Sequence, residues 1–256
     1  MALIFPKWTN EIPRVAAPVL TLLSGVVVFV VWFWFSPKHT DVGYAPVQPI
    51  PYSHALHAGR GMVKLTDGTM SSALGLDCRY CHNNVEKSAS AGVPATQTCM
   101  NCHKQVKLGS LLLAPLYKSW GDGKPENDGG GIPWKRIHKV ADYAYFPHAA
   151  HVGLKKEGAA IGCVTCHGRV DQMVVVAQQQ PLSMSWCLEC HNNPAVFLRP
   201  IDQITNMSWT TDPAWDAKAK DIATRLNPPG NKNAVTVMPD GQVIVRATAG
   251  CSGCHR

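Results

Sequence analysis

The cysteines of this chain are confined to five short segments that all have the form Cys-x-x-Cys-His. Two thiols at this spacing lie one helical turn apart and can form thioethers to the two vinyl groups of a haem. The histidine that follows can then bind the iron as its proximal ligand. The predicted thioether-forming residues are Cys78, Cys81, Cys99, Cys102, Cys163, Cys166, Cys187, Cys190, Cys251 and Cys254. The predicted proximal ligands are His82, His103, His167, His191 and His255. The pattern predicts five covalently bound c-type haems.

Other uses of paired cysteines do not account for this pattern. A structural zinc site takes its ligands in fours, so five pairs leave one pair unmatched and give the following histidines no role. Disulfides within such pairs would close very small loops and stabilise the fold little. A thioredoxin-like redox pair would occur once, within a βαβ pattern. Haem attachment is the interpretation that uses every cysteine and the histidine after each pair.

An uncharged apolar run covers residues 15–35, and its length matches the roughly 20 residues that a helix needs to cross a bilayer. The residues after it offer no small-x-small cleavage site, which favours an uncleaved anchor over a signal peptide. Basic residues precede the run, and the positive-inside rule then places residues 1–14 in the cytoplasm. Because c-type haems are attached on the outer face of the bacterial inner membrane, we expect residues 36–256 to form a periplasmic domain on a single-pass protein.

The formal net charge of +7 does not indicate nucleic-acid binding. Five haems add roughly −10 through their propionates and about +5 through their ferric cores, so the oxidised protein is expected to be near neutral. The sequence has no Lys/Arg cluster and no basic stripe interleaved with aromatic residues. Nucleic acid is therefore excluded as a partner.

The periplasmic part is expected to be a multihaem cytochrome c fold, wrapped around its haems and mostly irregular with short α-helices. Glycine and proline are frequent, and porphyrin faces supply apolar surface that an ordinary core would provide. A helix is predicted over 214–226, with Asp212 as its N-cap and Pro213 in its first position. A β-hairpin is predicted over 235–246.

An internal repeat organises this part of the chain. An aromatic-x-His-x-x-His element precedes two closely spaced haem segments in each of two units, at about 50–105 and 144–195. The region 196–256 then carries the last haem segment alone. Six histidines remain beyond the proximal ones, namely His39, His54, His57, His138, His148 and His151. Two imidazoles one helical turn apart, as in His-x-x-His, can reach two different irons.

The aromatic-x-His-x-x-His element resembles that of the small class III multihaem cytochromes c. The resemblance implies that the first histidine of each element, His54 or His148, is the distal ligand of the first haem in its unit. It implies that the second histidine, His57 or His151, serves the second haem of that unit. Both sets of residues match the motif as it stands in this sequence.

The C-terminal haem has no nearby histidine, since residues 192–250 contain none. Its distal ligand is left open between His138 and a methionine such as Met207 or Met238. His39 follows the apolar run closely and is interpreted as a residue of the membrane interface.

Iron with two histidine ligands leaves no open position for a substrate, so we expect this chain to transfer electrons and not to be catalytic alone. The sequence has no Cys-x-x-Cys-Lys segment of the multihaem nitrite reductase type, and no hydrolytic or nucleotide-binding motif. The anchor, the repeat and the five haem segments together resemble the pentahaem cytochrome c subunit of bacterial alternative complex III, over nearly the whole chain.

This resemblance implies a set of partners. A polytopic membrane subunit would oxidise menaquinol beside an iron–sulfur subunit on the outer face. The pentahaem subunit would collect the electrons, and a monohaem cytochrome c or a periplasmic copper or haem protein would accept them. Three alternatives stay open. They are a menaquinone reductase complex that takes electrons from periplasmic cytochromes, a tetrahaem-type quinol dehydrogenase with one anchor, and a free-standing membrane-anchored multihaem carrier.

Overall fold

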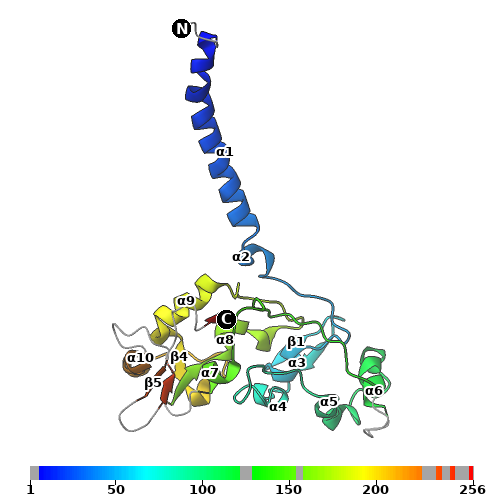
Figure 1. Cartoon of the computed structure of the whole chain (residues 1–256). Coiled ribbons are helices and arrows are strands. Elements are labelled where there is room, and N and C mark those ends of the chain that lie inside the picture. The colour runs from blue at the N-terminus through cyan, green and yellow to red at the C-terminus, as the bar shows by residue number, and fades with distance from the viewer. Residues whose placement is uncertain are drawn as a thin grey trace.

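A long N-terminal helix projects from a domain of short helices, loops and two-stranded sheets (Figure 1). The computed structural model describes residues 6–121, 129–153, 158–226, 235–237, 243–245 and 254–255. The α-helices are α1 (Ile12–Trp34), α2 (Pro37–Thr40), α3 (His54–Ala58), α4 (Cys78–Cys81), α5 (Thr96–His103), α6 (Ala114–Trp120), α7 (His148–Val152), α8 (Cys163–His167), α9 (Met184–Asn192) and α10 (Pro213–Leu226). The 3-10 helices are η1 (Lys7–Asn10), η2 (Leu111–Leu113), η5 (Val170–Gln172), η6 (Pro194–Phe197) and η7 (Ile201–Gln203). The strands are β1 (Met62–Lys64), β2 (Met70–Ser72), β3 (Ala159–Ile161), β4 (Leu198–Pro200), β5 (Val235–Val237) and β6 (Val243–Val245).

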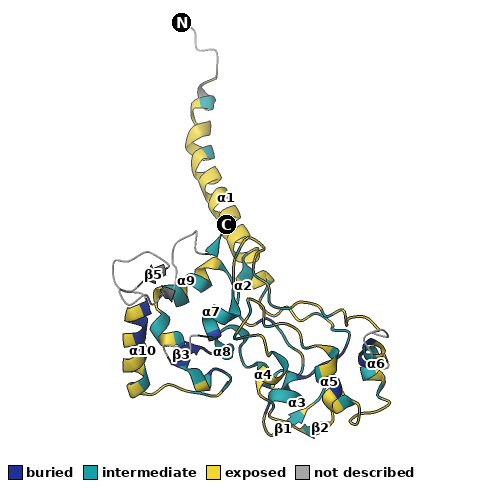
Figure 2. Cartoon of the chain, turned by 60° about the horizontal axis from the view of Figure 1, so that its bottom comes forward, coloured by how far each residue is buried: buried dark blue, intermediate teal, exposed yellow. Residues whose placement is uncertain are grey.

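Helix α1 contains most of the apolar run, but it begins at Ile12, upstream of the predicted start at Val15. The span Trp8–Trp34 has a mean hydropathy of 2.4, and its most apolar stretch is not buried inside the protein. Figure 2 shows α1 exposed along almost its entire length. A helix that is apolar on every side needs an apolar surrounding, and this one is long enough to cross a bilayer. Helix α1 is therefore a candidate membrane anchor.

The described strands pair into three short antiparallel sheets, β1–β2, β3–β4 and β5–β6. The predicted hairpin is confirmed in its strands, where Val235 pairs with Val245, and its turn lies outside the described residues. The predicted helix over 214–226 is also confirmed as α10, and Asp212 Oδ1 accepts the N–H of Trp215 at 2.8 Å. The other two sheets, β1–β2 and β3–β4, were not predicted; their strands have three residues each, and β3 and β4 are far apart in the sequence.

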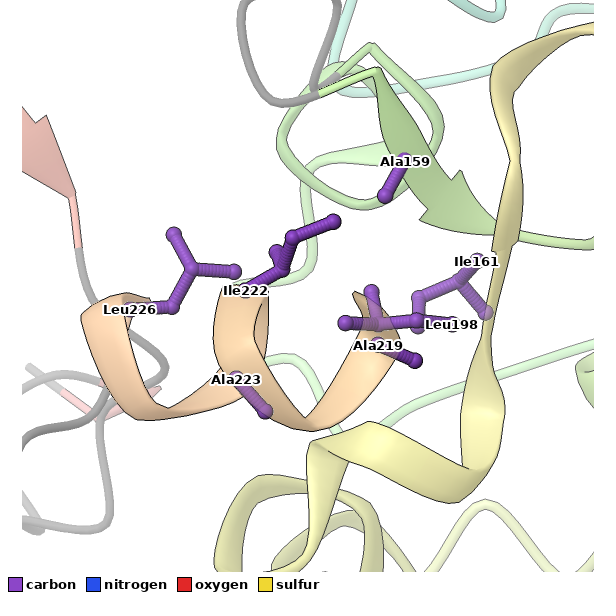
Figure 3. Close-up of a cluster of buried hydrophobic side chains, with 7 residues drawn as sticks. All are labelled: Ala159, Ile161, Leu198, Ala219, Ile222, Ala223 and Leu226. Atoms are coloured by element: carbon purple, nitrogen blue, oxygen red, sulfur yellow. The ribbon is translucent and has the colours of Figure 1, made fainter. Parts of the chain in front are cut away.

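The domain has several small apolar clusters in place of one large core. In the largest, one face of α10 packs against β3 and β4 (Figure 3). The α10 residues recur at the spacing of a single helix face, so burial of that face holds α10 on the sheet. The cluster consists of Ala159, Ile161, Leu198, Ala219, Ile222, Ala223 and Leu226. A second cluster contains Ile50, Met100 and Leu116, and a third contains Val152, Ala160 and Ile204.

Candidate haem-binding sites

Four of the five attachment segments lie on helices, namely α4, α5, α8 and α9. Residues three apart on a helix share a face, so the helical backbone brings the two thiols of each pair to one side. Helix α4 is capped by Asp77, whose Oδ1 accepts the N–H of Arg79 at 2.8 Å. The cysteines that the structure describes are free thiols, available for thioether bonds. In the fifth segment, Cys254 and His255 are described, and Cys251 lies outside the described residues.

Six candidate ligand histidines share one hydrogen-bonding pattern, in which ring Nδ1 contacts a backbone carbonyl oxygen. A carbonyl oxygen only accepts, so Nδ1 carries the proton and the lone pair of Nε2 is left free. Histidines that bind metals are commonly oriented by such a bond. The residue pairs are His57 with Ser53 (2.8 Å), His82 with Gly92 (2.9 Å), His103 with Val106 (3.2 Å), His148 with Ala89 (2.9 Å), His151 with Pro147 (2.9 Å) and His255 with Tyr143 (3.3 Å). These side chains fit iron binding through Nε2.

Three of the predicted ligand pairs have a separation that suits two ligands of one iron. Metal–imidazole bonds are about 2.0–2.1 Å long, and a ring centroid lies about 1.1 Å beyond the bound nitrogen. Two imidazoles on opposite sides of one metal therefore have centroids about 6.3 Å apart. The observed separations are 6.3 Å for His57 and His103, 6.1 Å for His151 and His191, and 6.4 Å for His148 and His167.

The two aromatic-x-His-x-x-His elements have the same ring packing. Tyr52 meets His54 edge-on at 4.8 Å and stacks on His57 at 4.4 Å. Phe146 repeats this arrangement, 4.8 Å from the first histidine of its element and 4.5 Å from the second. The aromatic ring thus packs against both imidazoles of its helix. The internal repeat is present in side-chain geometry as well as in the sequence.

Buried imidazoles surround the first and third attachment segments. Burial, with a smaller contribution from the charge of His82, lowers the pKa of His54 to about 4. Burial also lowers the pKa of His167 to about 3, with additional contributions from His138 and His148. These groups are therefore neutral near pH 7, and neutral imidazole is the form that binds iron.

The candidates for the fifth distal ligand occupy different places. The ring of His138 lies 4.3 Å from that of His167, and its Nε2 is buried without a hydrogen-bond partner among the described residues. Met207 is buried, and Met238 lies outside the described residues. His39 packs edge-on against Trp34 at 4.7 Å, at the end of α1.

The C-terminal segment is held by a stretch of chain that sequence reasoning did not single out. Ala144 and His255 form a β-bridge, and the N–H of Tyr145 donates to the carbonyl of Cys254 at 2.8 Å. The ring of Tyr143 lies 5.5 Å from that of His255. The two stretches are far apart in the sequence, and no local motif in 143–145 signals the contact.

No known protein-family profile matches the chain. Among characterised proteins, the chain is similar to the multihaem cytochrome c subunit of the menaquinone reductase of Nitratidesulfovibrio vulgaris (strain Hildenborough), with 29% identity over 149 residues. The aligned region is 56% of this chain and 56% of that relative, so the chain spans about half the length of the relative it matches. This similarity supports a multihaem cytochrome c subunit, and the Cys-x-x-Cys-His segments and the imidazole geometry fit covalently bound c-type haems.

Proposed function

We propose that this chain is the electron-transfer subunit of a membrane-bound quinol oxidoreductase of the alternative complex III type, with five c-type haems. It would carry electrons from menaquinol, oxidised in a partner subunit, to a periplasmic cytochrome or copper protein. The observation that carries the proposal is the set of imidazole pairs 6.1 to 6.4 Å apart, on a chain with a membrane-spanning candidate helix. Haem iron between two imidazoles supplies one-electron chemistry and has no free position for a substrate.

In this proposal the residues of the chain have defined roles. Each Cys-x-x-Cys pair holds one haem, and the histidine after it is the proximal ligand. The backbone carbonyls that accept from Nδ1 orient the imidazoles, and the small apolar clusters limit access of water. The distal partners are His54 for His82, His57 for His103, His148 for His167 and His151 for His191. The distal ligand of the C-terminal haem is His138 or Met207.

The proposed partners supply the quinone-binding site that one membrane helix cannot form. Helix α1 would cross the inner membrane once, with residues 36–256 on the periplasmic side. A single helix cannot enclose a quinone, so quinol oxidation belongs to polytopic membrane subunits. An iron–sulfur subunit and a monohaem cytochrome c would complete the complex. Without these partner subunits, the chain is not expected to catalyse quinol oxidation.

The second candidate function is that of the cytochrome subunit in a menaquinone reductase, where electrons flow from periplasmic cytochromes to the quinone. The observation that favours it is the 29% identity with a subunit of such an enzyme. Both candidates need the same haems, anchor and quinone-binding partners, and they differ in the direction of electron flow.

The experiment is isolation of the tagged full chain from its native membranes in a mild detergent. Both candidates predict that polytopic and iron–sulfur subunits remain bound. The isolated complex is then tested in both directions. Reduction of an oxidised periplasmic acceptor by a menaquinol analogue supports the first candidate, and quinone reduction by a reduced periplasmic cytochrome supports the second. A chain that purifies without any membrane partner contradicts both.

A further inference from the structure

The attachment segments have a spatial order that differs from their order along the chain. We propose that they form a single file in the order second, first, third, fourth, fifth. The first, third and fourth segments are then interior members of the file. The second segment and the fifth, which is placed by Cys254 and His255, are the two ends, where redox partners meet the file. The inference rests on the proposed function, in which each segment carries one haem, and its first test also uses the proposed distal ligands His54 and His57.

The first and second segments are in direct contact. Tyr80 and Asn101 occupy variable positions inside the two Cys-x-x-Cys motifs, and Asn101 Nδ2 donates to the Tyr80 hydroxyl at 3.2 Å. Residues just before the first segment also contact α3, the helix that carries the proposed distal ligand of the second segment. The N–H of Leu76 donates to the carbonyl of His57 at 2.8 Å, and the ring of His57 faces that of His103. The second segment therefore lies beside the first.

The first and third segments are joined where each begins. Thr205 Oγ1 donates to Asp77 Oδ2 at 2.9 Å, and the carbonyl of the preceding Ile204 accepts the N–H of Cys163 at 3.0 Å. The side chains of Cys78 and Cys163 are also in contact. The first cysteines of these two segments are therefore neighbours, although a whole haem segment separates them in the sequence.

Helices α3 and α7 also link the first and third segments, because each helix bonds to the chain that follows the segment of the other unit. In the first unit, the N–H of Ala55 donates to the carbonyl of Met173, just after the third segment, at 2.9 Å. In the second unit, the N–H of Ala149 donates to the carbonyl of Ser88, just after the first segment, at 3.1 Å. Each unit thus bonds its histidine-bearing helix to the chain that follows the first attachment segment of the other unit. This exchange supports the first and third segments as neighbours in the file.

The third and fourth segments share one apolar cluster. Strand β3 leads into the third segment, strand β4 follows the fourth, and the two strands pair with Ile161 opposite Leu198. Both residues belong to the cluster that α10 covers (Figure 3), and Cys190 of the fourth segment packs against it. The third segment therefore lies beside the fourth as well as beside the first.

The fourth and fifth segments meet at residues 143–145 and α7. The fifth segment bonds to Ala144 and Tyr145, and α7 begins a few residues later. Its His151 faces His191 of the fourth segment at 6.1 Å. In Figures 1 and 2 the C-terminus lies on the side of the domain nearer α2, and α5 and α6 lie on the side farther from it. The fifth segment is thus the end nearer the anchor, and the second segment is the remote end.

The test compares His57→Met with His54→Met in the full chain in detergent. These residues are one turn apart on α3 and are the proposed distal ligands of the second and first segments. Methionine in place of histidine raises the potential of that one haem. That haem is then already reduced when its neighbours titrate, and the changed charge shifts the midpoint potentials of adjacent haems. We expect one shifted neighbour for His57→Met and two for His54→Met, counted by spectroelectrochemical titration.

A file in chain order predicts the reverse, two shifted neighbours for His57→Met and one for His54→Met, and that result overturns the proposal. Equal counts for the two variants overturn it as well. A second pair of variants, Cys99→Ser/Cys102→Ser and Cys78→Ser/Cys81→Ser, removes one whole haem each and is expected to give the same counts of one and two. The haem content of the unaltered chain, measured by the pyridine haemochrome assay, distinguishes a failure of the proposed five haems from a failure of the proposed order. A value below five contradicts the haem assignment. Reversed neighbour counts in both pairs of variants contradict the order, and reversed counts in the methionine pair alone contradict the distal assignments of His54 and His57.

Discussion

The imidazoles of His148 and His167 lie 6.4 Å apart with their planes inclined by 15°, although they come from different helices. Nδ1 of His148 contacts the carbonyl of Ala89 at 2.9 Å, which leaves the lone pair of Nε2 free to bind a metal. If both rings bind one iron, His148→Ala removes one axial ligand. We expect one haem of the five to change from low spin to high spin, which electron paramagnetic resonance of the oxidised protein measures. His54→Ala is expected to do the same at another haem.

His39→Ala is the matched control for these variants. The ring of His39 packs on Trp34 at the end of α1, and we assign it no iron. Its replacement is expected to leave every haem low spin. Unchanged low-spin spectra in both His148→Ala and His54→Ala would contradict the distal assignments.

Five haems are expected per chain, because each Cys-x-x-Cys-His segment provides two thioether positions and a proximal ligand. The measurement is a pyridine haemochrome assay against protein mass on the fully matured protein. Cys187→Ser/Cys190→Ser should lower the value from five to four. A mature unaltered protein with only three or four haems is incompatible with the count.

Removal of residues 1–35, with a cleavable export signal in their place, is expected to release the haem domain from the membrane. The apolar span Trp8–Trp34 is the part of the described chain suited to cross a bilayer. The test is carbonate extraction of membranes from a strain that lacks the proposed partner subunits, because partners could otherwise retain the fragment. A fragment that stays in the membrane fraction of that strain argues against α1 as the anchor.

The isolated chain is not expected to oxidise quinol. The hydroxyl side chains within the apolar run 15–35, Thr21 and Ser24, both donate to backbone carbonyls of the same helix, at 2.9 Å in each case. Neither hydroxyl can accept the quinol protons near neutral pH. The purified subunit should be reduced by dithionite but not catalytically by a menaquinol analogue. Rapid reduction by the analogue that quinone-site inhibitors block would place a quinone site on this chain.

Asp77→Ala is expected to destabilise the folded chain by about 1 kcal/mol, because it removes the α4 cap and an exposed ion pair. Hydrogen bonds from Arg79 and Thr205 lower the pKa of Asp77 from 3.8 to about 2. The carboxylate is more stable in the folded state, so its contribution is complete above pH 3.8 and is lost as the pH falls toward 2. Thermal unfolding should therefore show a difference between unaltered protein and variant at neutral pH that shrinks in strong acid. A difference that persists unchanged at low pH would exclude the electrostatic cause.

Several features of this protein were predictable from the sequence because they depend on residues close together in the chain. Haem attachment needs only the spacing of two cysteines and a histidine, so the sequence alone predicts the sites at Cys78–His82 and its four counterparts. The apolar run of α1 and the Asp212-capped helix α10 are likewise local, and the structure has both helices. The antiparallel strands over 235–237 and 243–245 were predicted for the same reason.

Other features were decided by the tertiary structure, because they depend on contacts between distant residues. The position of His138 beside His167, the bridge between Ala144 and His255 and the adjacency of Cys78 and Cys163 have no local signature. The motif alone predicts that each element serves two irons, and only packing shows that α3 and α7 cross between the units. The sequence therefore predicts how many haems the chain can hold. The fold decided which imidazoles face each other and which attachment segments are neighbours, because spacing along the chain sets local geometry and packing sets proximity.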